Sequence, residues 1–154
     1  MPYQLFHEHF PDLAERETRI IELSDSHPFN GVPPGEYGLL EAFCNEKDCD
    51  CRRVMWMVSS VREKLTVAVV ACGWRSARLY KNWFGTGDPA IVQEIVQEMR
   101  GPILNMASSQ SSYAPAILDM LTKSILTDKT YIARVKRHYT QFRNKIETGS
   151  WFMA

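Results

Sequence analysis

Three of the four cysteines of this 154-residue chain fall within eight residues, spaced C-x4-C-x-C as Cys44, Cys49 and Cys51. The segments on either side, 37–43 and 52–59, are apolar and rich in strand-forming residues. If one strand ends at Cys44 and the next begins at Cys51, their Cβ atoms lie roughly 5 Å apart. Cys49 can then fold back over the same point. Because thiolate is a soft ligand that zinc favours, the spacing predicts a zinc-binding turn. The alternatives are three free thiols or a Cys44–Cys51 disulfide across the hairpin.

The rest of the chain divides into a strand block and a helix block. Strand patterns cover 18–24, 37–43, 52–59 and 65–72, with a Pro/Gly-rich loop at 25–35 and short polar turns between the later strands. Helical periodicity follows at 79–84, 89–100, about 113–126 and 128–146. The sequence therefore predicts an α+β fold, an antiparallel meander of three to four strands with about four helices packed on it. We expect one domain over 1–154, made of an irregular or helical lead-in (1–17), the sheet (18–73), the helical block (75–147) and an apolar tail (148–154).

The charges cancel overall but are divided unevenly along the chain. There are 18 acidic and 18 basic residues, so no global field favours nucleic acid or a membrane surface. Residues 1–50 carry 11 acids and 3 bases, whereas the remainder is net positive. The two parts therefore either attract each other or lie on different faces, unless the basic part contacts an acidic partner. The N-terminus lacks the features of a signal peptide and no apolar run is long enough for a membrane span, so we expect a cytoplasmic protein. In that compartment clustered cysteines are more often free or metal-bound than disulfide-bonded.

A tetrahedral zinc site requires a fourth ligand, and two residues compete for it. Cys72 ends the third strand of the meander, and a tight turn near 62–63 would place it opposite Arg53, on the face of Cys51. His138 lies on the apolar stripe of the last helix, where a buried imidazole needs partners for both ring nitrogens. The residues alone leave this choice open. Without a metal, Cys72 would be a small buried hydrophobic residue, and His138 would be a core histidine held by hydrogen bonds.

Several motifs together are similar to a family of uncharacterised bacterial proteins. They are PPGEY at 33–37, C-x4-C-x-C-R-R at 44–53, GW at 73–74, SxYAPA at 111–116 and KRHY at 136–139. The resemblance spans about residues 33–143. It implies a shared fold and a bacterial or phage-like source, but no activity. It also implies His138 as the fourth zinc ligand, because the position of Cys72 is often aromatic in that pattern.

The sequence supports a binding or interaction module with a structural zinc better than it supports an enzyme, and we predict no catalytic residue. A metal-dependent hydrolase is the alternative if only three cysteines bind the metal, with Glu46 or Glu41 as the base. The basic last helix suggests a third hypothesis, nucleic-acid binding. A homo-oligomer could form through the aromatic-rich helices or through the tail that contains Trp151.

Overall fold

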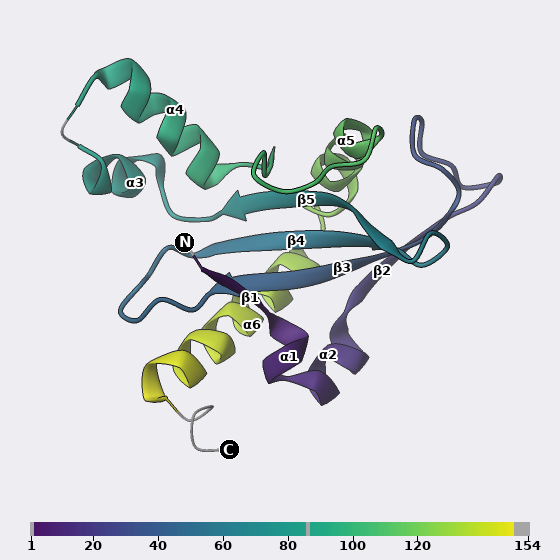
Figure 1. Ribbon diagram of the computed structural model, residues 1–154, viewed down its shortest axis with the longest axis horizontal. Coiled ribbons are helices and arrows are strands. Elements are labelled where there is room, and N and C mark those ends of the chain that lie inside the picture. Colours follow the sequence, from purple (N-terminus) through teal and green to yellow (C-terminus); the bar gives the residue numbers. More distant parts are fainter. Residues whose placement is uncertain (1, 86, 150–154) are drawn as a thin grey trace.

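The α+β fold predicted from the sequence is present in the computed structural model, which describes residues 2–85 and 87–149. One antiparallel sheet forms the centre of the molecule, and the helices lie around it (Figure 1). The strands are β1 (Tyr3–Leu5), β2 (Arg19–Leu23), β3 (Gly35–Cys44), β4 (Arg53–Ser60), β5 (Leu65–Gly73) and β6 (Ile103–Leu104). The helices are α1 (Phe6–His9), α2 (Pro11–Glu17), α3 (Ala77–Trp83), α4 (Pro89–Arg100), α5 (Ala114–Ser124) and α6 (Lys129–Thr148).

The meander β3–β4–β5 is the core of the sheet, as predicted. The predicted fourth strand is β2, which pairs with the first half of β3, while β1 pairs with the second half of β3 at the same edge. β6 adds to the opposite edge by pairing with β5. The sequence did not predict β1 or β6, and for the segment that contains the short helix α1 it predicted only an irregular or helical lead-in over 1–17. These elements have two to four residues each, too few for a hydrophobic period to be recognised.

A register shift in the hairpin β4–β5 decides which side chains lie together at its far end. Next to the turn, Ser59 pairs with Thr66, but beyond the irregularity at Val58 and Ser59 every pair is displaced by one residue. Such a bulge places two residues of one strand opposite one of its partner. Because side chains alternate between faces, a displacement of one residue moves a side chain to the other face of the sheet.

The helices begin largely where their capping residues predicted. Asp88 accepts a hydrogen bond from the backbone N–H of Ala90 at the start of α4, and Asp128 accepts one from that of Tyr131 at the start of α6. For the helix expected at about 113–126, the sequence also indicates Ser111 or Ser112 as the N-cap, and this prediction is wrong. The N-cap of α5 is Tyr113, which makes no capping bond through its side chain, and the helix ends at Ser124 rather than near Leu126.

The main hydrophobic core lies between the sheet and helices α5 and α6. Trp56 of β4 and Phe43 of β3 are buried against Tyr131 and Phe142 of α6. A second, smaller cluster joins α3 to α4 and consists of Tyr80, Val92, Val96 and Met99. Among the described residues, no helix is both long and apolar enough to cross a membrane. The predicted apolar tail lies largely outside the described residues, Trp151 included.

Candidate metal centre

The three clustered cysteines meet at one end of the sheet, in the turn between β3 and β4. Their sulfur atoms all lie within 4.8 Å of one another, so the group could hold a metal ion. Cys44 and Cys51 are fully buried, whereas Cys49 is half-buried. All four cysteines of the chain are free thiols. The sequence predicted this convergence correctly, because the three cysteines lie within eight residues that connect two adjacent strands, and so short a connection keeps their side chains close together.

Unusual backbone conformations fold the turn back on itself. Asp48 and Arg52 adopt left-handed φ angles of 60° and 48°, which non-glycine residues adopt infrequently. Asp48 directly precedes Cys49, and Arg52 directly follows Cys51. We refer below to residues 44–52 as the cysteine turn.

Neighbouring groups hold a negative charge on one of the three sulfurs. The hydrogen bond from the Cys51 thiol, the backbone N–H of Glu46 and the guanidinium of Arg143 lower the pKa of Cys44 to about 6, although burial opposes this shift. The pKa of Cys51 is raised, first by its bond to Cys44 and then by burial, and burial also raises that of Cys49. Cys44 is therefore the sulfur that loses its proton most readily, and a metal cation would offset the repulsion among three thiolates once the other two protons are displaced.

One face of α6 holds the cysteine turn in place. The guanidinium of Arg143 is buried and donates to the carbonyl oxygens of Cys44 (2.6 Å) and Glu46 (2.7 Å). Four residues earlier, the hydroxyl of Tyr139 accepts a hydrogen bond from the backbone N–H of Arg52 (3.0 Å). Four residues later, Glu147 accepts one from that of Asp48 (2.8 Å). The spacing of four places all three side chains on the same face of the helix.

A second attachment comes from α3 and α4. The hydroxyl of Tyr80, which is fully buried, donates to the carbonyl oxygen of Cys51 (2.6 Å). Arg53 follows the turn directly, and its guanidinium donates to the carbonyl oxygens of Met99 (2.9 Å) and Glu98 (3.2 Å) at the end of α4. The backbone around the thiols is therefore fixed by hydrogen bonds from two separate parts of the chain.

The structure does not bring His138 to the cysteines, contrary to the expectation of a fourth ligand. Its Nδ1 lies 2.7 Å from a carboxylate oxygen of Glu41, and its Nε2 lies 2.8 Å from one of Glu17. A neutral imidazole carries one N–H, so two carboxylate acceptors are both satisfied only by the imidazolium. Burial disfavours that charge, but the hydrogen bonds and charges of Glu41 and Glu17 outweigh it and raise the pKa of His138. Both ring nitrogens of His138 are therefore occupied by carboxylates and are not available to a metal at the cysteines.

Cys72 is also separated from the other three cysteines. The bulge in the β4–β5 hairpin places it opposite Val54 and not opposite Arg53 as expected. It therefore lies on the face of the sheet from which Trp56 contacts Tyr131 of α6. Its half-buried thiol contributes to a cavity beside α4, and burial raises its pKa. Neither residue proposed for the fourth position belongs to the group of converging ligands among the described residues.

Two glutamates considered as catalytic bases have different surroundings. Glu41 is buried and accepts hydrogen bonds from the Tyr131 hydroxyl (3.0 Å) and from His138. Glu46 belongs to the cysteine turn but is exposed, and its backbone N–H faces the sulfur of Cys44 at 3.5 Å. Sequence reasoning missed the pairing of Glu41 with His138. The signal was available, because an acid in the middle of an apolar strand requires a buried partner.

A polar groove lies beside the half-buried cysteine. Its volume is about 520 Å³, and it runs between the cysteine turn and α6. Cys49 lies at its wall together with Asp48 and Asp50 of the turn, facing Lys136 and Asn144 of α6. Solvent therefore reaches the cluster from the side of Cys49.

Most of the cations on α6 that suggested nucleic-acid binding make contacts inside the protein. Arg137 forms two hydrogen bonds to the Glu17 carboxylate, and Arg134 donates to the Glu17 carbonyl oxygen. Lys145 donates to the carbonyl oxygen of His9, and Arg143 is bound to the cysteine turn. These contacts also explain the uneven charge along the sequence, because basic residues of α6 bind the acidic first third of the chain.

Comparisons with known proteins add no relative. A scan of the chain against protein-family models found no match, and searches of curated proteins and of solved structures found no similar protein. The resemblance to a bacterial family, and the source that it implies, stay predictions.

Proposed function

We propose that this protein binds zinc through Cys44, Cys49 and Cys51, and that the metal stabilises a binding module without taking part in a reaction. The observation that carries the proposal is the convergence of three sulfurs within 4.8 Å, two of them fully buried. In a tetrahedral site with Zn–S bonds of about 2.3 Å, sulfurs are about 3.8 Å apart. A small contraction of the turn would therefore form three bonds.

The donor set favours zinc among the common metals. Three thiolates from one turn suit a soft or borderline cation and disfavour magnesium and calcium, which take oxygen ligands. Zinc also has no geometric preference of its own, so it can accept the positions that this backbone imposes.

A structural role follows from what surrounds the cluster. Hydrogen bonds from α6 and α3 reach the backbone of the turn, so a metal there would fix the junction of the sheet with both helices. Three thiolates also more than neutralise a divalent cation, which weakens it as a Lewis acid.

A metal-dependent hydrolase is a second candidate, supported by one observation. Three ligands leave the fourth position of a tetrahedral site open, as in catalytic zinc centres, and Cys49 borders a groove of about 520 Å³. Against it, Glu41, one of the two glutamates considered as a base, is engaged by His138 and Tyr131, and the other, Glu46, is exposed.

Metal analysis of cysteine variants tests the proposal. We expect about one zinc per chain in protein purified without added metal, and a charge-transfer band from thiolate to Co²⁺ after exchange. Cys49→Ser should lose most of the metal, whereas Cys72→Ser, the matched control, and His138→Gln should keep it. A folded protein that binds neither zinc nor Co²⁺, or equal loss of metal in Cys72→Ser, would refute the proposal.

A further inference from the structure

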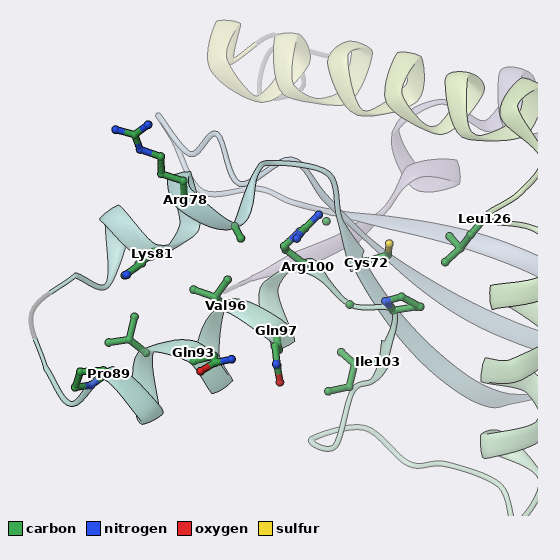
Figure 2. Close-up of a pocket in the computed structure, with 15 residues that line it drawn as sticks. Cys72, Arg78, Lys81, Pro89, Gln93, Val96, Gln97, Arg100, Ile103 and Leu126 are labelled. Carbon is green, nitrogen blue, oxygen red and sulfur yellow. The ribbon is translucent and has the colours of Figure 1, made fainter.

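A second cavity lies away from the cysteines, between helices α3 and α4 and the end of β5 (Figure 2). Its volume is about 1000 Å³, at the upper end of the range for small-molecule sites in proteins. Nothing in the proposed zinc site uses it.

The cavity is elongated because it follows one stripe of α4. Residues 89, 92, 93, 96, 97 and 100 line it, a helical repeat of three and four that runs the whole length of the helix. At about 1.5 Å per residue, the stripe is roughly 16 Å long. The buried side chains of Val92 and Val96 form its floor, and Ile103 and Leu126 extend this apolar surface at the end near β5. A linear aliphatic chain matches a surface of this shape.

The charged groups among the described lining residues all have one sign. Arg78, Lys81 and Arg100 line the cavity, and none of the described lining residues is acidic. Figure 2 shows Lys81 pointing from α3 toward α4 and Arg100 beside Cys72, while Arg78 extends outward. The side chains of Lys81 and Arg100 form no hydrogen bond or ion pair with the described residues. Two cations that form no ion pair among the described residues, above an apolar floor, favour a ligand with a negatively charged head.

The lining also favours aliphatic anions over nucleotides. None of the described residues that line the cavity is aromatic, so the ring that most often stacks on a nucleobase is missing from this lining. An aliphatic body is therefore favoured over a nucleotide.

Fixed contacts hold the end of the cavity next to β5. At Gly73 a Cβ atom would lie 2.4 Å from both the Met99 carbonyl oxygen and the Tyr80 hydroxyl, so the end of β5 is in close contact with both helices. Arg53 holds the last turn of α4 by two hydrogen bonds. The cavity is therefore formed before any ligand arrives, which limits the entropy lost on binding.

We propose that this cavity binds a single-chain aliphatic anion, with the chain along Val92 and Val96 and the carboxylate or phosphate head at Lys81 or Arg100. The inference does not rest on zinc binding and can fail or succeed separately from it.

Calorimetric titration with matched amphiphiles tests the proposal, using the full chain and probe concentrations below micelle formation. Dodecanoate and dodecyl phosphate should bind, and dodecanol and dodecyltrimethylammonium should bind at least about tenfold more weakly. Equal binding of dodecanol and the two anions would overturn the role of the cations. Tighter binding of AMP than of either anion would overturn the aliphatic assignment.

Variants on the exposed rim locate the site. The double variant Lys81→Gln/Arg100→Gln should weaken dodecanoate binding about tenfold. Gln97→Trp should abolish dodecanoate binding, because the indole would fill the cavity. Arg16→Gln removes an exposed cation from α2 and should leave binding unchanged. Circular dichroism would establish that each variant is folded. Unchanged dodecanoate binding in either of the two cavity variants, or equal weakening in Arg16→Gln, would refute the proposed site.

Discussion

The buried ion cluster of Glu17, Glu41 and His138 predicts a large and pH-dependent loss of stability when its histidine is removed. In His138→Leu the side chain keeps its approximate volume, but Glu41, which is only 5% exposed, keeps a single hydrogen bond, from Tyr131. Removing one partner of a buried ion pair costs about 3–5 kcal/mol because the remaining charge is uncompensated. For a domain of this size, this loss corresponds to a fall in melting temperature of roughly 6–20 °C.

The sign of the pH dependence follows from the raised pKa of His138. A group whose pKa is raised by folding contributes its stability fully below its ordinary value, about 6.5 for histidine, and loses it as pH rises through the folded-state value. The difference between parent and variant should therefore be largest in mildly acidic solution and should narrow at alkaline pH. Glu17 behaves oppositely. The hydrogen bond from Arg137, followed by that from His138, lowers its pKa to about 2, so its contribution is lost only as pH falls from about 4 toward 2.

Urea denaturation followed by circular dichroism, at constant ionic strength and between about pH 5 and pH 9, measures both effects. The double variant Glu41→Gln/His138→Leu removes the uncompensated charge and should recover part of the loss, giving a clear departure from additivity. The reasoning is refuted if His138→Leu costs less than about 1 kcal/mol or if its cost is the same at every pH.

Three further predictions concern the cysteine turn and its surroundings. Arg143→Met removes a buried donor from the carbonyl oxygens of Cys44 and Glu46, of which the second still accepts from the Cys49 N–H. The free energy of unfolding should therefore fall by about 2–4 kcal/mol in chemical denaturation, and a loss below about 0.5 kcal/mol would contradict the role of this guanidinium. Gly73→Ala introduces a Cβ in contact with Met99 and Tyr80 and should lower the free energy of unfolding by about 1–3 kcal/mol. The control Gly38→Ala, which has nothing within 4 Å of its added Cβ, should be nearly neutral. Similar losses in both variants would show that β5 has room to move. A chelator should lower the melting temperature by roughly 5–10 °C relative to protein in zinc at a hundred times its dissociation constant, and added zinc should restore it, whereas a zinc-independent melting temperature would contradict a structural metal.

The parts of the fold that follow from the sequence are those with local causes. The meander and the long helices follow from hydrophobic periods and from caps such as Asp88, and the convergence of the three cysteines follows from their proximity in one turn. The position of Cys72 does not follow, because a bulge at Val58 and Ser59 has no clear signature in the sequence and moves every later pair by one residue.

The partners of His138 were missed for a different reason. Its place on the inner stripe of α6 was correctly inferred, but Glu41 and Glu17 lie 97 and 121 residues away in sequence. A buried histidine has the same periodic signature whether it binds a metal or a carboxylate. Only the acid at position 41, within an otherwise apolar strand, distinguishes a histidine that binds a carboxylate from one that binds a metal.

The attachment of α3 and α4 has a consequence for how the protein opens. Their small cluster around Tyr80 and Val96 is separate from the main core, and polar bonds from Tyr80 and Arg53 join it to the strand ends. Regions with few buried apolar contacts unfold locally at a lower free energy than the global transition. Amide hydrogens of these two helices should therefore exchange with solvent together, ahead of those of β3, β4 and α6. An event at Cys51 would then change how often this part of the molecule detaches, with the central sheet left intact.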